Sequence, residues 1–224
     1  MGLQVLHEDN HTIVVNKQPS DLVQGDKTGD RTLPDEIKKY LKHKYNKEGN
    51  VFCGVVHRLD RPTSGALVFA RTSKGLSRLN EQFRDKDTKK IYWAIVENLP
   101  NKSQGTLEGH LKKNEKQNKS YVVDSKVQGA KHAVLKYKTI KSSDKYHLLE
   151  IELETGRHHQ IRCQLANIGC IIKGDLKYGA KRSNKDGSIS LHARVLEFNH
   201  PTSKELISIT APTPNDPLWN FFQE

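Results

Sequence analysis

Cysteine, methionine and long apolar runs are scarce in this sequence. Its 224 residues include three cysteines and one methionine. An odd number of cysteines without a CxxC pair argues against a disulfide framework and against a cysteine-based zinc site. No apolar run approaches the ~20 residues of a membrane helix, so we expect neither an integral membrane protein nor a membrane partner. The first ten residues lack the basic start and apolar core of a signal peptide, which predicts a cytoplasmic protein.

Acidic residues are also in the minority. The chain has 26 Asp and Glu against 37 Lys and Arg, a formal charge of +11, and an isoelectric point near 9.5. This excess favours a polyanionic partner, with nucleic acid first and an anionic membrane surface second. A predicted helix beginning after Thr32 carries a lysine face that includes Lys38 and Lys42. Such a face is usually solvated surface and sometimes a track for phosphates.

Repeats and low-complexity linkers are absent, which predicts a single domain over residues 1–224. Short apolar runs separated by turn residues indicate many strands, and only a few segments have helical periodicity. One such segment, beginning near residue 157, has a core stripe of Ile161, Leu165 and Ile168. The pattern predicts an α+β fold with a mixed, mainly antiparallel sheet and a few flanking helices.

The segment HRLDRPTSG (57–65) is the first candidate for chemistry. We expect it to be a loop between a buried strand over 51–56 and another over 66–70, with Ser64-Gly65 as its exit turn. Its single carboxylate, Asp60, is flanked by Arg58 and Arg61, which should keep it ionised and lower its pKa. An ionised, oriented carboxylate can act as nucleophile or general base. The alternative is a turn aspartate in a surface ion pair.

The segment ETGRHHQIRCQL (154–165) is the second candidate. Its basic residues crowd the predicted first turns of a helix, where free N–H groups favour anions. Arg162 borders the core stripe, and an arginine in such a place usually has a buried carboxylate partner. His158 and His159 would point about 100° apart on a helix, so we expect no shared metal ion.

Tyr92, within the apolar strand KIYWAIV, completes the candidates. It is either a core tyrosine or a platform on which a base could stack. P-loop, GxGxxG, kinase and GxSxG motifs are absent, so nucleotide cofactors and serine hydrolase chemistry have no support.

Taken together, HRLDRPTSG, KIYWAIV, TGRHHQIR, GDLKYGA and LHARVLEFNHP resemble the motifs of the pseudouridine synthase family, specifically its RluA branch. Each motif is weak alone, but they occur in family order and span residues 51 to about 212. The opening IVVNKQP resembles the first core strand of the family, with Gln18 where a KPxG turn would have proline. The resemblance implies the family's catalytic fold with a central RNA-binding cleft.

The resemblance also implies an activity: isomerisation of uridine in RNA to pseudouridine, without cofactor or metal. Asp60 falls on the essential aspartate, and Arg58 on the residue that fills the stack after the uridine is flipped out. Tyr92 falls on the aromatic residue that packs against the base, and Arg162 on the arginine paired with the aspartate. Attack of Asp60 on C1′, removal of the C2′ proton and attack on C6 of the uracil all remain open. A flipped base needs such a pocket, wedge and stacking partner.

Many family members carry an N-terminal S4-type RNA-binding module, and we expect none here because only about fifty residues precede the HRLD loop. The catalytic domain, predicted to be a monomer, would then hold ribosomal or transfer RNA through its own lysines. The candidates for backbone contacts are Lys38, Lys42, Lys89, Lys90, Lys112, Lys113 and Lys116. The alternative functions are a non-catalytic RNA-binding or ribosome-assembly protein on the same scaffold and, less favoured, a metal-dependent nuclease, which requires clustered carboxylates.

Overall fold

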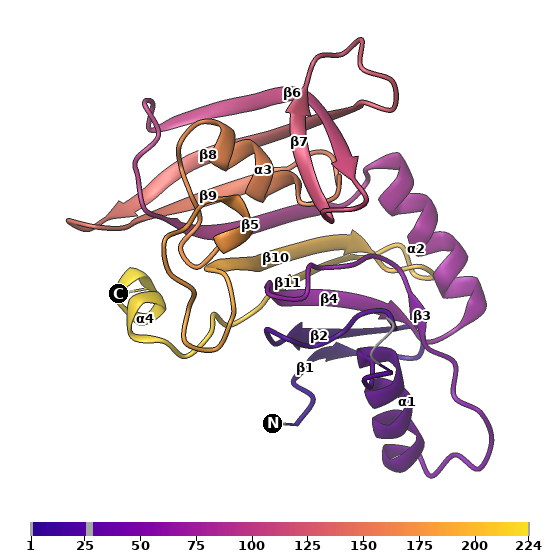
Figure 1. Cartoon of the computed structure of the whole chain (residues 1–224). Coiled ribbons are helices and arrows are strands. Elements are labelled where there is room, and N and C mark those ends of the chain that lie inside the picture. The colour runs from indigo at the N-terminus through magenta and orange to yellow at the C-terminus, as the bar shows by residue number, and fades with distance from the viewer. Residues whose placement is uncertain (1, 26–28, 224) are drawn as a thin grey trace. The chain divides into compact units, whose positions relative to one another are not determined.

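The computed structural model describes residues 2–25 and 29–223 (Figure 1). Within these residues the chain forms two compact units. Unit 1 comprises residues up to 89 together with 193–214, and unit 2 comprises residues 90–192 together with the chain from 215. Across the part of the chain that the structure describes, no helix is long and apolar enough to cross a membrane.

Unit 1 is built on a sheet with the strand order β1-β2-β4-β10, to which β11 and the short β3 add at β10 and β4. The pairs β1–β2, β2–β4, β3–β4 and β10–β11 are antiparallel, as predicted. The elements are β1 (Val5–Glu8), β2 (Thr12–Lys17), α1 (Leu33–Lys44), β3 (Gly54–Val55), β4 (Ser64–Ala70), α2 (Ser73–Asp85), β10 (Leu191–Asn199) and β11 (Leu206–Thr210).

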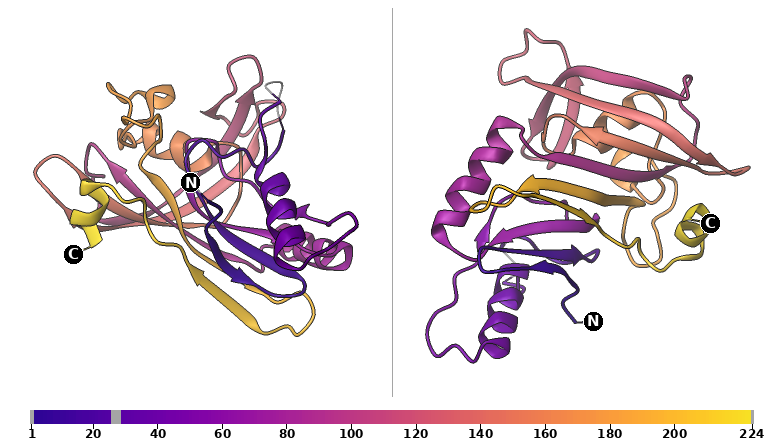
Figure 2. Two further views of the ribbon diagram at one scale, coloured as in Figure 1. Left: turned by 90° about the horizontal axis from the view of Figure 1, so that it is seen from below. Right: turned by 180° about the vertical axis from the view of Figure 1, so that it is seen from behind.

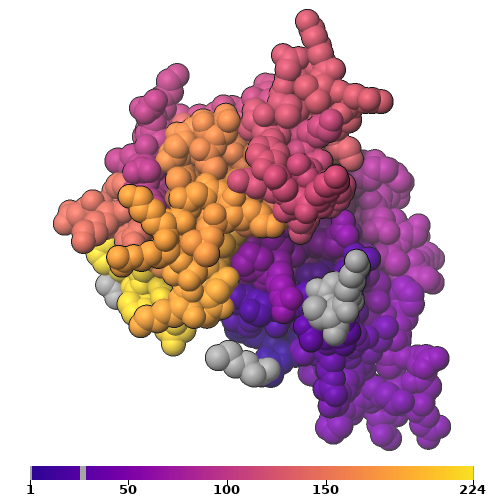
Figure 3. Space-filling view, in the orientation of Figure 1, coloured from indigo at the N-terminus to yellow at the C-terminus, as the bar shows by residue number. Residues whose placement is uncertain are grey.

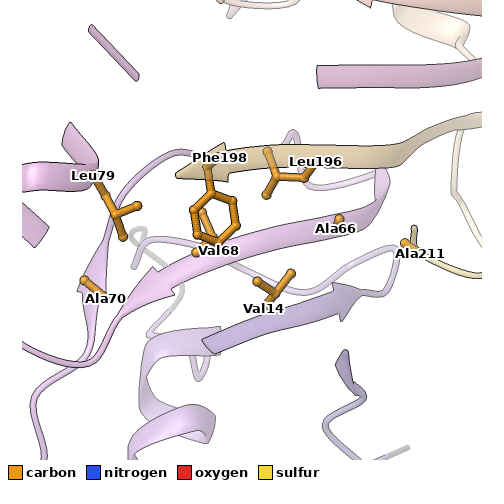
Figure 4. Packing of buried hydrophobic residues seen from close by; sticks show 8 residues of the cluster. All are labelled: Val14, Ala66, Val68, Ala70, Leu79, Leu196, Phe198 and Ala211. Carbon is orange, nitrogen blue, oxygen red and sulfur yellow. The ribbon is translucent and has the colours of Figure 1, made fainter. Parts of the chain in front are cut away.

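The core of unit 1 lies on β2 and β4, both buried along their whole length. Val14 and Val68 pack with Phe198 of β10 and with Leu79, which α2 presents from its apolar stripe (Figure 4). Side chains that alternate with these along β2 and β4 are equally buried, so both faces of the two strands are covered. The end of β2 and the start of β4, where the candidate loop is attached, are therefore rigidly held.

Helix α1 begins as the sequence predicts. Thr32 and Asp35 form a capping box, in which the Asp35 carboxylate accepts hydrogen bonds from the backbone N–H and the hydroxyl of Thr32. Leu33, Ile37 and Leu41 are buried on one face, and the lysines occupy the other. The amphipathic period thus fixes which side of α1 faces solvent.

Unit 2 contains a sheet with the strand order β5-β9-β8-β6-β7. Its adjacent pairs are all antiparallel, and β6 and β7 form a hairpin where the sequence predicted a hairpin or a loop. The elements are β5 (Lys89–Val96), β6 (Gln104–Asn114), β7 (Lys119–Val123), β8 (Lys131–Ser142), β9 (His147–Leu153), α3 (Gln160–Asn167), the 3-10 helix η1 (Leu176–Tyr178) and α4 (Pro217–Gln223).

The C-terminal helix α4 closes one end of this sheet (Figure 2). Trp219 and Phe222 pack against Ile95 of β5 and Leu148 of β9. The Lys141 ammonium donates to the carbonyl of Phe221, 3.0 Å away, and lies over the ring of the same residue. The last turn of the chain is therefore part of the core of unit 2.

Two local predictions were wrong. The apolar run 51–56 forms only the two-residue strand β3, and Phe52 is 42% exposed, because a strand of this length at the edge of β4 buries little surface. The predicted exit turn at Ser64-Gly65 is instead the start of β4. Gly65 is needed there for another reason: its φ is +119°, and a Cβ atom would lie 2.3 Å from the carbonyl oxygen of Ala193.

Candidate active site

Asp60 lies in the loop between β3 and β4, in unit 1, and its side chain is partly exposed. Leu59, next to it, is buried and anchors the loop. The backbone carbonyl of Asp60 accepts a hydrogen bond from the N–H of Thr63 at 3.0 Å, which closes a turn around the carboxylate-bearing residue. The candidate carboxylate is thus carried on an ordered turn immediately before a fully buried strand.

Lys17, the last residue of β2, is hydrogen-bonded to the backbone of this turn. It is 0% exposed, and its ammonium donates to the backbone carbonyls of Gln18, Arg61 and Thr63 at 3.0, 2.9 and 2.7 Å. An ammonium has three N–H donors, so all are used. Two of the three carbonyls belong to residues that follow Asp60, and Lys17 therefore fixes the backbone path that aims the carboxylate.

Burial lowers the pKa of Lys17 to about 8; Asp21 and Asp60 oppose this effect, whereas Arg61 adds to it. Deprotonation would remove one donor and leave one of the three carbonyls without its partner. We therefore expect the rate of the reaction at this site to fall as pH rises through about 8, measured in single-turnover assays between pH 6.5 and 9.5.

Global unfolding would not explain that loss. The native pKa of Lys17 lies below its usual value of 10.5, so between these two values the unfolded chain binds more protons at this group. The contribution of Lys17 to the free energy of unfolding therefore rises with pH in that window. A flat rate profile through pH 8, or a parallel fall in thermal stability, would contradict the assignment.

The arginines beside Asp60 contact side chains of the segment that precedes α1. Arg58 is exposed, and its Nη1 donates to Oε1 of Gln24 at 2.8 Å. Nη2 of Arg61 lies 3.7 Å from Oδ2 of Asp30, with both side chains about half exposed. His57, at the start of the motif, stacks on Phe83 of α2 and accepts a hydrogen bond from the N–H of Val68. The motif is thus tied to α2 and β4, while Arg58 extends toward solvent.

Arg162 lies in unit 2, in α3, and is 5% exposed. Its Nε and Nη2 donate to the two carboxylate oxygens of Asp175 at 2.6 and 2.8 Å, and Asp175 is itself 1% exposed. This bidentate pair confirms the expectation that Arg162 has a buried carboxylate partner. The pairing of Arg162 with Asp60 that the resemblance implies stays a prediction.

The two adjacent histidines do not occupy helical turns as predicted. His159 is the N-cap of α3 with a left-handed φ of +52°, and His158 precedes the helix. Their rings are therefore not splayed but stacked, with centroids 3.8 Å apart. Among the residues that the structure describes, no group of three or more His, Cys, Asp or Glu side chains could hold a metal ion. Ile168, predicted to be in the core, is 39% exposed because α3 ends at Asn167.

Tyr92 lies in β5, opposite Ile151 of β9, and is 7% exposed. This burial is that of a core tyrosine, the first of the two predicted alternatives, and the stacking role of Tyr92 stays a prediction. It belongs to unit 2, as Arg162 does.

The predicted backbone-binding lysines lie on three elements. Lys38 and Lys42 are exposed on α1, and Lys89 and Lys90 begin β5. Lys112 and Lys113 lie near the end of β6, just before its final residue Asn114, and Lys116 is in the turn that follows. All except the partly buried Lys90 are exposed, and the hairpin stands at the surface in the space-filling view (Figure 3). Lys113 also forms an ion pair with Glu115 at 2.6 Å.

Two residues of the candidate site were missed from the sequence, Lys17 and Asp175. The strand pattern of TIVVNK gave no signal for Lys17, because a lysine at the end of a strand is usually exposed, whereas this one is 0% exposed. For Asp175, the motif resemblance pairs Arg162 with Asp60 and so gives no reason to expect a second carboxylate. The GDLKYGA segment lies only 13 residues beyond Arg162 and supplies a second carboxylate.

Comparison with known proteins agrees with this arrangement. Residues 11–167 match the family model for RNA pseudouridylate synthase. An uncharacterized RNA pseudouridine synthase of Bacillus subtilis, YlyB, is 32% identical over 219 residues, covering 96% of this chain and 71% of the relative. Ribosomal large subunit pseudouridine synthase D of Zymomonas mobilis is 33% identical over 225 residues, covering 96% and 70%.

Among solved structures, human RNA pseudouridylate synthase domain containing 4 superposes with a TM-score of 0.79. The match covers 98% of this chain and 90% of the human chain at 24% identity, which extends the likeness in fold over both units. The family model, which spans most of the sequence and includes the Asp60 loop and Arg162, and the bacterial relatives give one answer. The chain belongs to the RNA pseudouridine synthase family.

Proposed function

We propose that this enzyme converts specific uridines of large-subunit ribosomal RNA to pseudouridine, with Asp60 as its catalytic residue. The observation that carries the proposal is the Asp60 turn: the fully buried Lys17 donates two hydrogen bonds to its backbone, at the carbonyls of Arg61 and Thr63, while the Asp60 side chain remains partly exposed. Preorganisation of one carboxylate suits a reaction that needs no other reactive group. The choice of ribosomal RNA is supported by the names of relatives from Zymomonas, Xanthomonas and Pseudomonas.

The reaction exchanges one bond for another without loss or gain of atoms. The bond from C1′ to N1 breaks, the uracil turns, C5 bonds to C1′, and the proton on C5 is replaced by one on N1. Asp60 would initiate this exchange as nucleophile or base. A neighbouring region of the protein must meanwhile keep the detached uracil from diffusing away, which calls for a closed, apolar wall.

Three further residues have substrate-binding roles in this proposal. Tyr92 packs against the uracil; its burial in β5 supports this role because the ring is held in place. Arg162 binds the substrate through its guanidinium, and the bidentate pair with Asp175 supports this role because it fixes the position of that guanidinium. Arg58, which is exposed, enters the space that the flipped uridine leaves in the RNA stack.

The RNA backbone would be held by the exposed lysines of α1, β5 and the β6–β7 hairpin. Three of them, Lys112, Lys113 and Lys116, belong to one hairpin, whose two strands are paired from His110↔Val123 to Asn114↔Lys119. A paired hairpin presents its charges at fixed spacing, which favours contacts with successive phosphates.

Replacing Lys112, Lys113 and Lys116 together by glutamine should flatten the salt dependence of RNA binding. Each phosphate contact contributes about 0.7 to 0.9 to the slope of log Kd against log salt, so three lost contacts should reduce it by about 2. Filter binding between 50 and 300 mM KCl would measure the slope. The matched control replaces the exposed Lys102, Lys145 and Lys185, which removes the same charge from elsewhere in unit 2. Equal slopes for the two triple variants would show that the hairpin lysines do not bind the RNA backbone.

Pseudouridine mapping tests the proposed substrate. Total RNA from cells with and without the gene, mapped by carbodiimide-dependent reverse-transcription stops, should differ at one or a few uridines of the large-subunit RNA. Complementation with the wild-type chain should restore them. Sites lost only from transfer RNA would redirect the substrate assignment, and no lost site would favour the non-catalytic RNA-binding function.

The proposal places the enzyme in the cytoplasm, where assembling ribosomal RNA is reached in bacteria, and has it act as a monomer. Light scattering at micromolar concentration should give a mass near 25.5 kDa. A stable dimer would contradict the monomer.

A further inference from the structure

The hydroxyl of Tyr178 binds the outer edge of the β6–β7 hairpin. β7 is the edge strand of the unit 2 sheet, and Ser120 is paired with Lys113 of β6. The hydroxyl of Tyr178 accepts a hydrogen bond from the N–H of Ser120 at 2.9 Å and donates to the carbonyl of the same residue at 3.2 Å. Edge backbone groups that would otherwise need water or another strand are thus satisfied by one side chain.

Other contacts hold the same edge. The Ser120 hydroxyl donates to the carbonyl of His158 at 2.7 Å, and the Lys177 ammonium donates to the carbonyl of Asn118 at 3.1 Å. Two cations lie over the Tyr178 ring, Lys119 at 4.9 Å and Arg162 at 5.1 Å from its centroid. The hairpin is thereby attached to the residues on either side of α3.

The hydrogen bonds continue from Tyr178 to Arg162 through His159. Nη1 of Arg162 lies 3.0 Å from Nε2 of His159, and a guanidinium only donates, so this nitrogen must be the acceptor. The proton of the neutral ring is then on Nδ1, which donates to the Tyr178 hydroxyl 3.2 Å away. Burial, with Arg162 as the next cause, lowers the pKa of His159 to about 2, which keeps the ring neutral.

We propose that His159 and Tyr178 are positioning residues, which hold Arg162 in a fixed geometry relative to the β6–β7 hairpin. The inference rests on the proposed function, in which the hairpin binds RNA and Arg162 binds the substrate. Arg162 donates to His159, His159 donates to the Tyr178 hydroxyl, and that hydroxyl donates to the carbonyl of Ser120, so the donor of each of these hydrogen bonds is fixed by the one before it. RNA held by the hairpin is then presented to an arginine whose position is already set.

The tautomer of the His159 ring can be measured by NMR on the protein alone, without RNA. Nitrogen-15 chemical shifts of the histidine rings should show His159 as the neutral Nδ1–H form from pH 5 to 8. Tyr178→Phe should shift that signal, because the Nδ1–H loses its acceptor. A proton on Nε2 of His159, or a titration of this ring between pH 5 and 8, would contradict the proposed hydrogen bonds from Arg162 through His159 to Tyr178.

Tyr178→Phe also tests the consequence for the reaction, because it deletes one hydroxyl and retains the ring. We expect the single-turnover rate at saturating RNA to fall about 10- to 100-fold, since small misplacements of a positioned group cost this much, while Kd for RNA changes less than about twofold. Tyr137→Phe, which removes the hydroxyl of another buried tyrosine of unit 2, should keep the wild-type rate. An unchanged rate in folded Tyr178→Phe would overturn the proposal.

Two replacements of His159 distinguish positioning from stability. The glutamine of His159→Gln can offer an oxygen to Arg162, whereas the asparagine of His159→Asn can offer an N–H to Tyr178 but does not reach Arg162. The left-handed φ of +52° at this position suits asparagine better, so thermal stability should rank Asn above Gln. Activity should rank Gln above Asn. If stability and activity rank the two variants in the same order, His159 has a purely structural role and the proposal is overturned. If the wild-type protein forms no pseudouridine, the proposed function is contradicted. The nitrogen-15 measurement of the His159 tautomer then tests the positioning proposal by itself.

Discussion

Replacement of Asp60 by asparagine should abolish pseudouridine formation while the protein stays folded and still binds RNA. The amide has nearly the shape of the carboxylate but cannot act as nucleophile or base, so the rate should fall by about three orders of magnitude or more. The backbone bonds that form the turn, from Thr63 N–H and from the Lys17 ammonium, do not involve the carboxylate and should survive the substitution. Release of tritium from RNA labelled at C5 of uridine, where the reaction removes the proton, would measure the rate.

The matched control is Asp30→Asn. Asp30 is exposed, lies near Arg61 in the same unit, and loses the same charge. Its activity should stay within about threefold of the wild type, as is usual for surface substitutions away from a site. RNA affinity of Asp60→Asn should match or slightly exceed that of the wild type because a negative charge has been removed. Full activity in folded Asp60→Asn would remove the centre of the proposed mechanism.

The largest loss of stability is expected from Asp175→Ala. The substitution leaves the Arg162 guanidinium 5% exposed with its bidentate partner gone, and removal of one member of a buried ion pair costs about 3–5 kcal/mol. The hydrogen bond to His159 cannot compensate, because it satisfies only one nitrogen of the guanidinium. Urea denaturation monitored by tryptophan fluorescence would give the free energy of unfolding.

Two further variants make that result specific. Asp144→Ala removes an exposed aspartate from the turn between β8 and β9 and should change stability by less than about 0.5 kcal/mol. The double variant Arg162→Met with Asp175→Leu replaces both charges by apolar groups and should recover most of the lost stability. It should remain inactive, since the proposed substrate-binding arginine is gone. A stable Asp175→Ala protein would mean that Arg162 is satisfied elsewhere.

Short-range patterns predicted most of the secondary structure. The capping box at Thr32 and Asp35 and the alternation in HLLEIEL depend on neighbours in the chain, so a single sequence reveals them. The run VFCGVV misled because apolar composition does not say how many partner strands are available. Only two of its residues, Gly54 and Val55, pair with β4, so the rest of the run does not form a strand.

The sequence predicted those residues of the candidate site that lie together in one motif. It did not predict contacts between residues that are far apart in the sequence. Asp60 and its flanking arginines lie in one recognisable motif. The lysine beneath them comes from a strand 43 residues earlier in the chain, and its role depends on reaching three carbonyls. The stacked histidines follow from a left-handed backbone at His159, which no side-chain periodicity encodes.

The division of the chain bears on how the protein is made. Unit 1 acquires Leu196 and Phe198 of its core only from β10, and unit 2 acquires Trp219 and Phe222 only from α4. A nascent chain that has emerged as far as residue 192 therefore holds two unfinished cores with exposed apolar faces. Because these closing contacts join residues far apart in sequence, folding should be slow and should wait until β10 and α4 have been synthesised. An interrupted translation product would be a substrate for chaperones and proteases rather than a partly active enzyme.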